Sequence, residues 1–247
     1  MLEIGILKAR QFARQKHGKQ TRLSGDFFFA HPERVADRLA TLGFDEDTIC
    51  AGYLHDVVED TGTTIEDIRK HFNEDIAHMV AAVTKFKKGT FIPPLMIDDT
   101  MPVDWPHKAN ARLMHYTERM LRASVRNPGA LAIKAADQCD NVSDIAHLEP
   151  EAIRTLLRIL KYVYLPLFDE GREIFEAKAP NLKPSFDKLI DELLIHQQQG
   201  IEFLKHYRHG AHAIADFEFA KTATLEELVP KGALDKADDA WAFGEGE

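Results

Sequence analysis

The sequence predicts an all-α protein. Apolar residues recur at spacings of three and four along most of the chain, and few stretches alternate with the period of two that a strand requires. Helix-start signals precede several of these stretches, and glycine or proline follows others. Hydrophobic residues make up 45% of the 247 residues, which is ample for a buried core. We therefore expect helices that pack around such a core.

The N-terminal part of the chain is predicted to form five helices. Pro32 suits the first turn of the second helix, and Gly62 ends the third. Thr64 and Asp67 have the spacing of a capping box, which predicts the start of the fourth helix. The five helices are predicted over about residues 3–16, 31–42, 47–61, 64–72 and 75–86.

A proline-rich insert separates these helices from a second helical part. Four prolines between residues 87 and 107 exclude a continuous helix, and ordered loops of this length are often lids or contact surfaces. A disordered surface excursion is an equally good interpretation. The helices that follow are predicted over about residues 109–123, 130–139, 149–178 with a kink at Pro166, 184–209 and 213–229. Residues 231–247 are acidic and rich in Gly and Ala, and we expect them to fray.

Composition and charge exclude several classes of protein. The net charge is −9 and no long basic block is present, which argues against a nucleic-acid-binding protein. A small anionic substrate stays compatible with this charge, because a local basic pocket can lie on an acidic protein. Cys50 and Cys139 form no CxxC motif, which fits a reducing cytosol and a cytoplasmic location. No apolar run approaches 18 residues, so no membrane span is expected, and a homo-oligomer stays open.

The strongest chemical signal is the run His55-Asp56-Val57-Val58-Glu59-Asp60. Chance gives about one His-Asp pair in a chain of this composition, but the added Glu-Asp makes the full pattern rare. An imidazole beside a carboxylate suits a divalent metal, and spare carboxylates suit the handling of water that the metal activates. The alternative is a solvated acidic helix end, which the neighbouring apolar residues disfavour. The run therefore indicates a metal-dependent hydrolase of phosphate esters or anhydrides.

Two residues cannot complete a metal shell, so further ligands must come from elsewhere in the chain. His31 stands at a predicted helix start beside a loop that contains Gly and Ser. Asp137 ends a largely apolar helical run. A single histidine is more often structural than a ligand, and spacing alone leaves both assignments open.

Five blocks resemble the HD hydrolase domain of the RelA/SpoT alarmone enzymes. The order and spacing of the blocks agree with that family over about residues 1–175. The blocks are His17-Gly18-Lys19-Gln20-Thr21-Arg22-Leu23-Ser24-Gly25, His31-Pro32-Glu33-Arg34-Val35-Ala36, His55 to Thr61, Val83-Thr84-Lys85 and Lys134-Ala135-Ala136-Asp137-Gln138-Cys139-Asp140-Asn141. The resemblance implies an HD-domain helical bundle over residues 1–178. A helical extension with an acidic tail, over residues 179–247, is then expected to pack on the same domain.

The resemblance also implies a reaction and assigns roles to individual residues. The reaction removes the 3′-pyrophosphate of (p)ppGpp and yields GDP or GTP plus pyrophosphate. One Mn²⁺ per chain would be bound, and a second group of residues would handle the hydrolytic water. A third group would bind the nucleotide, and basic side chains such as Lys85 and Lys134 could hold the pyrophosphate. The groups are His31, His55, Asp56 and Asp137 for the metal, Glu59 and Asp60 for the water, and Arg22, Ser24, Asn141 and Arg154 for the substrate.

The chain departs from the family pattern near the expected nucleotide contacts. Gln138 and Asp140 replace an Arg and a His, Leu23 replaces a basic residue, and Phe27-Phe28 replaces a Pro-Tyr pair. No synthetase domain is expected after the match, so we expect a stand-alone alarmone hydrolase. One alternative substrate is an adenine alarmone such as (p)ppApp, or another phosphorylated nucleotide. A second alternative is a binding protein or antitoxin that sequesters alarmone without turnover.

Overall fold

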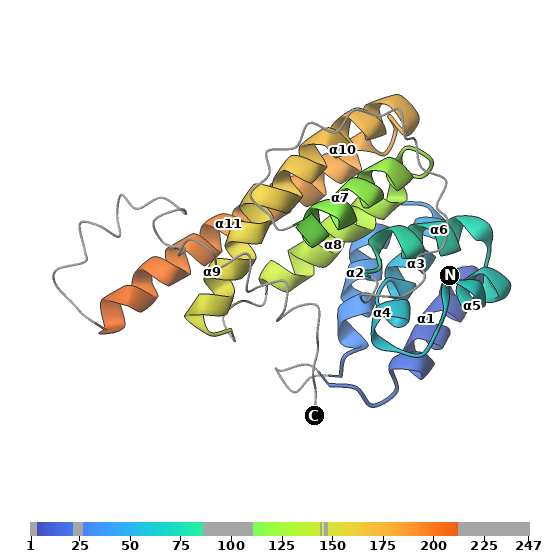
Figure 1. The fold of residues 1–247 in the computed structure, drawn as a ribbon, viewed down its shortest axis with the longest axis horizontal. Helices are drawn as coiled ribbons and strands as arrows, with labels where there is room; N and C mark the ends of the chain where they lie inside the picture. Colours follow the sequence, from blue (N-terminus) through green and yellow to red (C-terminus); the bar gives the residue numbers. More distant parts are fainter. Residues whose placement is uncertain (1–3, 22–26, 86–110, 144, 146–147, 212–247) are drawn as a thin grey trace.

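The computed structural model describes residues 4–21, 27–85, 111–143, 145 and 148–211 (Figure 1). Within these ranges the regular elements are helices, and Thr21 and Phe27 form an isolated antiparallel bridge. The predicted all-α fold is confirmed. The insert at 87–107, the helix at 213–229 and the tail at 231–247 lie outside the described residues.

Six helices form the N-terminal part of the fold. They are α1 (Ile4–His17), α2 (Ala30–Thr41), α3 (Glu46–Leu54), α4 (Val57–Asp60), α5 (Ile65–His71) and α6 (Glu74–Val83). Helix α3 is almost entirely buried and packs against α1, α2 and α6. Gly52 allows the close approach of α3 to α2, because a Cβ at this position would lie 2.8 Å from Leu39 Cδ1. This contact brings the second half of α2 against the last turn of α3.

Side chains at the helix starts explain where several of these helices begin. Asp45 accepts a hydrogen bond from the backbone amide of Thr48 and caps α3. The predicted capping box of α5 is confirmed, since Thr64 and Asp67 each accept a bond from the backbone amide of the other. Asn73 caps α6 in the same way as Asp45 caps α3.

The predicted third helix is wrong in one respect, because it is not continuous through His55 and Asp56. Helix α3 ends at Leu54 and α4 begins at Val57. The His55 imidazole donates from Nδ1 to the carbonyl of Gly52, at 2.8 Å. In a continuous helix that carbonyl would accept from the amide of Asp56, four residues later. The side chain of His55 therefore takes a backbone acceptor and lies in a turn between two helices.

The C-terminal part of the described chain is built around a buried helix. It contains α7 (Ala111–Ser124), α8 (Gly129–Ser143), α9 (Pro150–Ile159), the π-helical segment η2 (Leu160–Tyr164), α10 (Leu165–Lys178) and α11 (Lys183–Ala211). Helix α8 contacts α2, α3, α6, α7, α10 and α11, and α11 runs along it (Figure 1). Residues 129–140 of α8 are all buried. A helix that is enclosed on every side can carry buried polar groups only where partners satisfy them.

The predicted irregularity near Pro166 takes the form of η2. Helices α9 and α10 are joined through five residues of π-helix that end just before the proline. Proline lacks an N–H, and its ring crowds the carbonyl one turn earlier, so the regular bonding pattern cannot continue there. A π-helical turn absorbs this change without ending the helix. Among the described residues, no helix is both long enough and apolar enough to cross a membrane.

Candidate metal centre and active site

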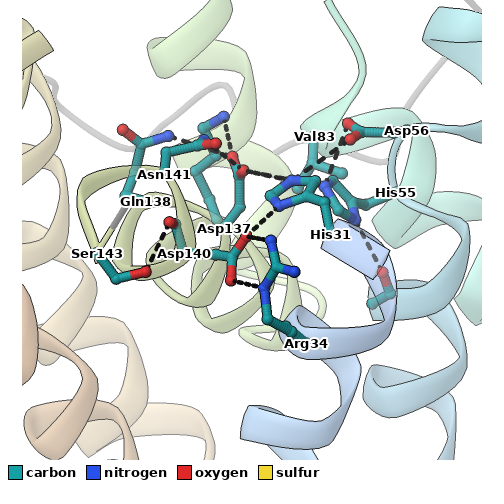
Figure 2. Close-up of polar contacts among 12 residues, drawn as sticks. His31, Arg34, His55, Asp56, Val83, Asp137, Gln138, Asp140, Asn141 and Ser143 are labelled. Carbon is teal, nitrogen blue, oxygen red and sulfur yellow. Dashed lines mark hydrogen bonds and ion pairs between the residues drawn. The ribbon is translucent and has the colours of Figure 1, made fainter. Parts of the chain in front are cut away.

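Four predicted metal ligands converge between α2, the α3–α4 turn and α8 (Figure 2). His31 Nε2 lies 3.2 Å from Asp137 Oδ1 and 3.5 Å from Asp56 Oδ2. His55 Nε2 lies 3.1 Å from Asp56 Oδ1 and 4.0 Å from Asp137 Oδ1. Ligand atoms of His31, His55 and Asp56 all fall within 4.8 Å of one another. Residues that are more than 100 positions apart in the sequence therefore meet at one point.

Both imidazoles present the same nitrogen to this point because the other nitrogen is already bonded. His31 donates from Nδ1 to Asp140 Oδ2 at 2.6 Å, and His55 donates from Nδ1 to the Gly52 carbonyl at 2.8 Å. A bond of this kind fixes the ring orientation and leaves Nε2 as the free donor atom for a metal. Both side chains are buried, so these orientations are also held by packing.

The Asp137 carboxylate is held by three donors from its own helix. Lys134 Nζ donates to Oδ2 at 2.6 Å, Gln138 Nε2 to Oδ2 at 3.2 Å, and Asn141 Nδ2 to Oδ1 at 2.7 Å. Lys134 is buried, and its Nζ lies 5.1 Å from the centre of the Tyr164 ring. Lys134 is therefore a partner of Asp137, and the suggestion that it holds pyrophosphate stays a prediction.

The charges in the cluster compensate one another in the absence of a metal. Burial lowers the pKa of His55, but Asp56 and Asp137 outweigh burial and raise it to about 9. Burial likewise lowers the pKa of His31, and hydrogen bonds to Asp137 and Asp140 raise it overall. Burial raises the pKa of Asp137, but Lys134 and His31 hold that pKa well below its usual range. The carboxylates are thus ionised and are held opposite groups that carry or accept positive charge.

The donor set fits a divalent transition metal. Two imidazole nitrogens and the carboxylates of Asp56 and Asp137 face one point, and mixed N/O sets of this kind suit Mn²⁺, Fe²⁺ or Zn²⁺. His55 Nε2 is buried and makes no hydrogen bond of regular geometry, although Asp56 Oδ1 lies 3.1 Å away. A cation between these two atoms would satisfy both the nitrogen and the carboxylate. The described residues therefore contain a possible metal site.

The two predicted water-handling carboxylates lie on α4, directly after Asp56. Glu59 Oε2 accepts a hydrogen bond from the backbone amide of Lys85, at 3.0 Å. The backbone carbonyl of Asp60 accepts from Gln20 Nε2, at 2.9 Å. Partial desolvation, followed by repulsion from Asp56 and Glu59, raises the pKa of the Asp60 carboxyl to about 7. Asp60 is thus partly protonated at neutral pH even though its side chain reaches the solvent.

Helix α7 supports the segment that contacts Glu59, a role that no motif in the sequence indicated. Helix α6 ends at Val83 rather than near residue 86. The Tyr116 hydroxyl donates to the carbonyl of Val83 at 2.7 Å. Arg119 donates to the carbonyls of Ala81 and Thr84, at 2.6 Å each. These bonds satisfy carbonyls at the end of α6 and fix the position of the Lys85 amide.

The predicted substrate-binding residues fall into three groups. Asn141 is brought to the centre, where it contacts Asp137. Arg154 lies on α9, where it donates from Nη1 to Glu151 at 3.1 Å, and its Nε is buried without a hydrogen-bond partner. Arg22 and Ser24 lie outside the described residues.

The chain is similar to known proteins over most of its length. A family model described as HD domain matches residues 9–172. Guanosine-3′,5′-bis(diphosphate) 3′-pyrophosphohydrolase of Aquifex aeolicus is 32% identical over 162 residues, which are 66% of this chain and 21% of that protein. The probable enzyme of the same name from Synechocystis sp. is 36% identical over 202 residues, which are 78% of this chain and 24% of that protein.

The chain spans only about a fifth to a quarter of the length of these curated relatives. A solved structure, described as that of a metazoan ortholog of SpoT that hydrolyzes ppGpp, is 20% identical to the chain. The likeness covers 78% of this chain and 97% of that one, with a TM-score of 0.43. Because the HD domain model matches more than half of the sequence, the protein belongs to the HD domain family, as the sequence resemblance predicted.

Proposed function

We propose that this protein is a metal-dependent 3′-pyrophosphohydrolase that degrades (p)ppGpp to GDP or GTP and pyrophosphate. The observation that carries the proposal is the four-residue centre of His31, His55, Asp56 and Asp137 with two further carboxylates on the next helical turn. The curated relatives bear the name of this activity, which supports the choice of substrate.

In this proposal the four ligands hold one Mn²⁺ ion. When bound, the cation would neutralise charge on phosphoryl oxygens and make a water molecule more acidic. His31 and His55 would supply neutral nitrogen donors once the cation displaces the Nε2 protons, and their orientation is set through Nδ1. Asp137 is kept in place by Lys134 and Asn141, so the ligand geometry exists before the substrate arrives.

Glu59 and Asp60 then move the proton of the attacking water. Glu59 is held by the Lys85 amide through one oxygen, which leaves its other oxygen available as an acceptor. Partial desolvation and the neighbouring carboxylates raise the pKa of Asp60 in the metal-free protein, which favours uptake of a proton by this group. This pair suits a reaction in which a proton leaves the water and another reaches the leaving group.

The nucleotide would be bound by residues around this centre. We assign Asn141 to the ribose side, because it already contacts Asp137. Arg154 is assigned to the phosphates, and its buried Nε without a partner is compatible with an added acceptor. Arg22 and Ser24 are assigned to the base on the resemblance alone. We infer a small-molecule substrate and a cytosolic protein, and the boundary between an HD domain at 1–178 and an extension at 179–247 stays a prediction.

The test is turnover of a nucleotide panel by the EDTA-stripped full chain, with and without added Mn²⁺. ppGpp, pppGpp and ppApp are incubated separately, and nucleotide products and pyrophosphate are quantified by chromatography. The proposal expects Mn²⁺-dependent conversion of ppGpp to GDP and pyrophosphate. Cleavage of ppApp alone would change the proposed substrate but not the proposed metal-dependent hydrolysis. Tight binding of ppGpp without any product, in the presence of Mn²⁺, would contradict hydrolysis and favour a sequestering protein.

A further inference from the structure

An ion pair between the buried Asp140 and the more exposed Arg34 lies behind His31, on the side away from the other ligands (Figure 2). Asp140 follows Asp137 by three residues on α8, so the two carboxylates share one face of the helix. Asp137 reaches the Nε2 side of the His31 ring, and Asp140 reaches its Nδ1 side. His31 is therefore held between two carboxylates from a single helix.

Arg34 closes this arrangement from α2, one turn after His31. Its Nε donates to Asp140 Oδ1 at 2.6 Å, and its Nη2 donates to Oδ2 at 2.9 Å. Two-point contact between a guanidinium and a carboxylate fixes both the position and the plane of the carboxylate. The Asp140 side chain is 1% exposed, so its charge needs such a partner. The His31 imidazole of α2 thus lies between Asp137 and Asp140 of α8, and Arg34 of α2 binds Asp140.

We propose that Asp140, clamped by Arg34, is a positioning residue that sets the orientation and ligand strength of His31. The inference rests on the metal centre of the proposed function. A carboxylate behind an imidazole makes the metal-facing nitrogen a stronger donor and fixes its direction. His55 is backed by the neutral carbonyl of Gly52, so the two histidines are supported by different chemistry. Of the two histidines, His31 is the one whose strength depends on a replaceable side chain.

The test measures Mn²⁺ affinity directly, by calorimetric titration of the EDTA-stripped full chain without substrate. Asp140→Asn keeps the size of the side chain and removes its charge. We expect it to bind Mn²⁺ about 10- to 100-fold more weakly than the native chain, the loss that is typical of such outer partners. Arg34→Gln leaves Asp140 in place without its clamp, and we expect a smaller loss of the same sign.

Arg38→Gln is the matched control. Arg38 lies one turn further along α2, and its Nε and Nη2 contact Glu192 of α11, at 3.0 and 2.9 Å. The control therefore removes an arginine ion pair from the same helix without touching His31, and its Mn²⁺ affinity should stay within about twofold of native. Helical content and urea unfolding in EDTA identify any variant that does not fold. If Asp140→Asn does not fold, the Mn²⁺ affinity of Arg34→Gln decides whether the inference stands.

Activity provides a second measurement that separates positioning from catalysis. If alarmone is hydrolysed, the rate of Asp140→Asn should recover as Mn²⁺ is raised about 10- to 100-fold. Native Mn²⁺ affinity in folded Asp140→Asn would overturn the inference, whatever the activity. An Arg38→Gln loss as large as that of Arg34→Gln would also overturn it. If Asp140→Asn binds Mn²⁺ more weakly but the native chain hydrolyses no alarmone, only the proposed function is contradicted.

Discussion

The two sides of the candidate site are supported in different ways. The ligand side is formed by His31, His55, Asp56 and Asp137. Both histidines donate outer hydrogen bonds to buried acceptors, and Asp137 accepts them from Lys134 and Asn141. The carboxylate turn, which is helix α4 with Glu59 and Asp60, is four residues long and is held mainly through backbone groups. So short a helix has little stability of its own.

In the proposed reaction, metal binding and proton transfer would therefore have separate structural bases. The ligand side depends on α2 and α8, which pack against each other in the core. The carboxylate turn depends on the Lys85 amide, and that amide depends on Tyr116 and Arg119 of α7. Substitutions on one side should therefore change metal affinity, and substitutions on the other should change the rate at unchanged metal affinity.

Asp137→Asn should have the largest effect. It weakens a ligand that lies near both histidines, so we expect Mn²⁺ binding and nearly all turnover to be lost. Calorimetry and the nucleotide assay measure the two quantities. Asp187→Asn is the control, because Asp187 is also bound by a lysine, Lys183 at 2.9 Å, but lies on α11. Native Mn²⁺ affinity in Asp137→Asn would remove Asp137 from the ligand side.

Lys134→Met should destabilise the metal-free protein by about 3 kcal/mol, because it leaves the buried Asp137 without its cation. Added Mn²⁺ should recover part of this loss, since the metal takes over the neutralisation of Asp137. Urea unfolding in EDTA and in Mn²⁺ provides the measurement. Lys183→Met, which breaks a partly exposed pair, should cost less than about 1 kcal/mol in both conditions. An equal loss for Lys134→Met with and without metal would show that Lys134 acts through packing alone.

Tyr116→Phe should weaken the support of the carboxylate turn without affecting the ligand side. The variant loses one hydrogen bond to the Val83 carbonyl, and we expect about 1 kcal/mol less stability. Turnover should fall while Mn²⁺ affinity stays native. Tyr53→Phe is the control, because it removes a hydroxyl that contacts Asp37 Oδ1 at 3.1 Å. Parallel loss of metal affinity and turnover in Tyr116→Phe would mean that the two sides are coupled.

Asp60→Asn should have little effect on stability near pH 4, and its effect should grow as pH rises. The folded state holds the Asp60 proton up to a pKa of about 7, whereas the ordinary value is 3.8. Between pH 3.8 and about 7 the unfolded chain binds fewer protons than the folded protein at this carboxyl. Ionisation of Asp60 therefore lowers the free energy of unfolding as pH rises. In EDTA, Asp60→Asn should therefore gain stability over the native protein at pH 8 but not at pH 4. The free energy of unfolding is measured with urea at both pH values. An equal difference between Asp60→Asn and the native protein at both would contradict the raised pKa.

Local signals in the sequence predicted most of the fold. Apolar spacing located the helices, and Thr64 with Asp67 marked the start of α5 correctly. These features depend on residues a few positions apart, which a sequence displays directly. The break after Leu54 could not be predicted in this way, because the side chain of His55 competes for a backbone carbonyl.

The site was predictable only in part, for the same reason. The His55-Asp56 pair is adjacent in the sequence, whereas the contact between His31 and Asp140 spans 109 positions. Arg34 and Tyr116 carry no local signal at all, because each acts on a partner that only the fold brings near. The roles of the metal and substrate residues stay predictions until variants are measured.

The most direct measurement is made on Glu59→Gln, with Mn²⁺ affinity and turnover determined on the same sample. Glutamine keeps the shape of the side chain and its bond to the Lys85 amide but cannot accept a proton as a carboxylate does. We predict a Mn²⁺ dissociation constant within about twofold of native and a rate that is lower by about a hundredfold or more. A native rate, or a metal affinity that falls in step with the rate, would contradict the separation of metal binding from proton transfer.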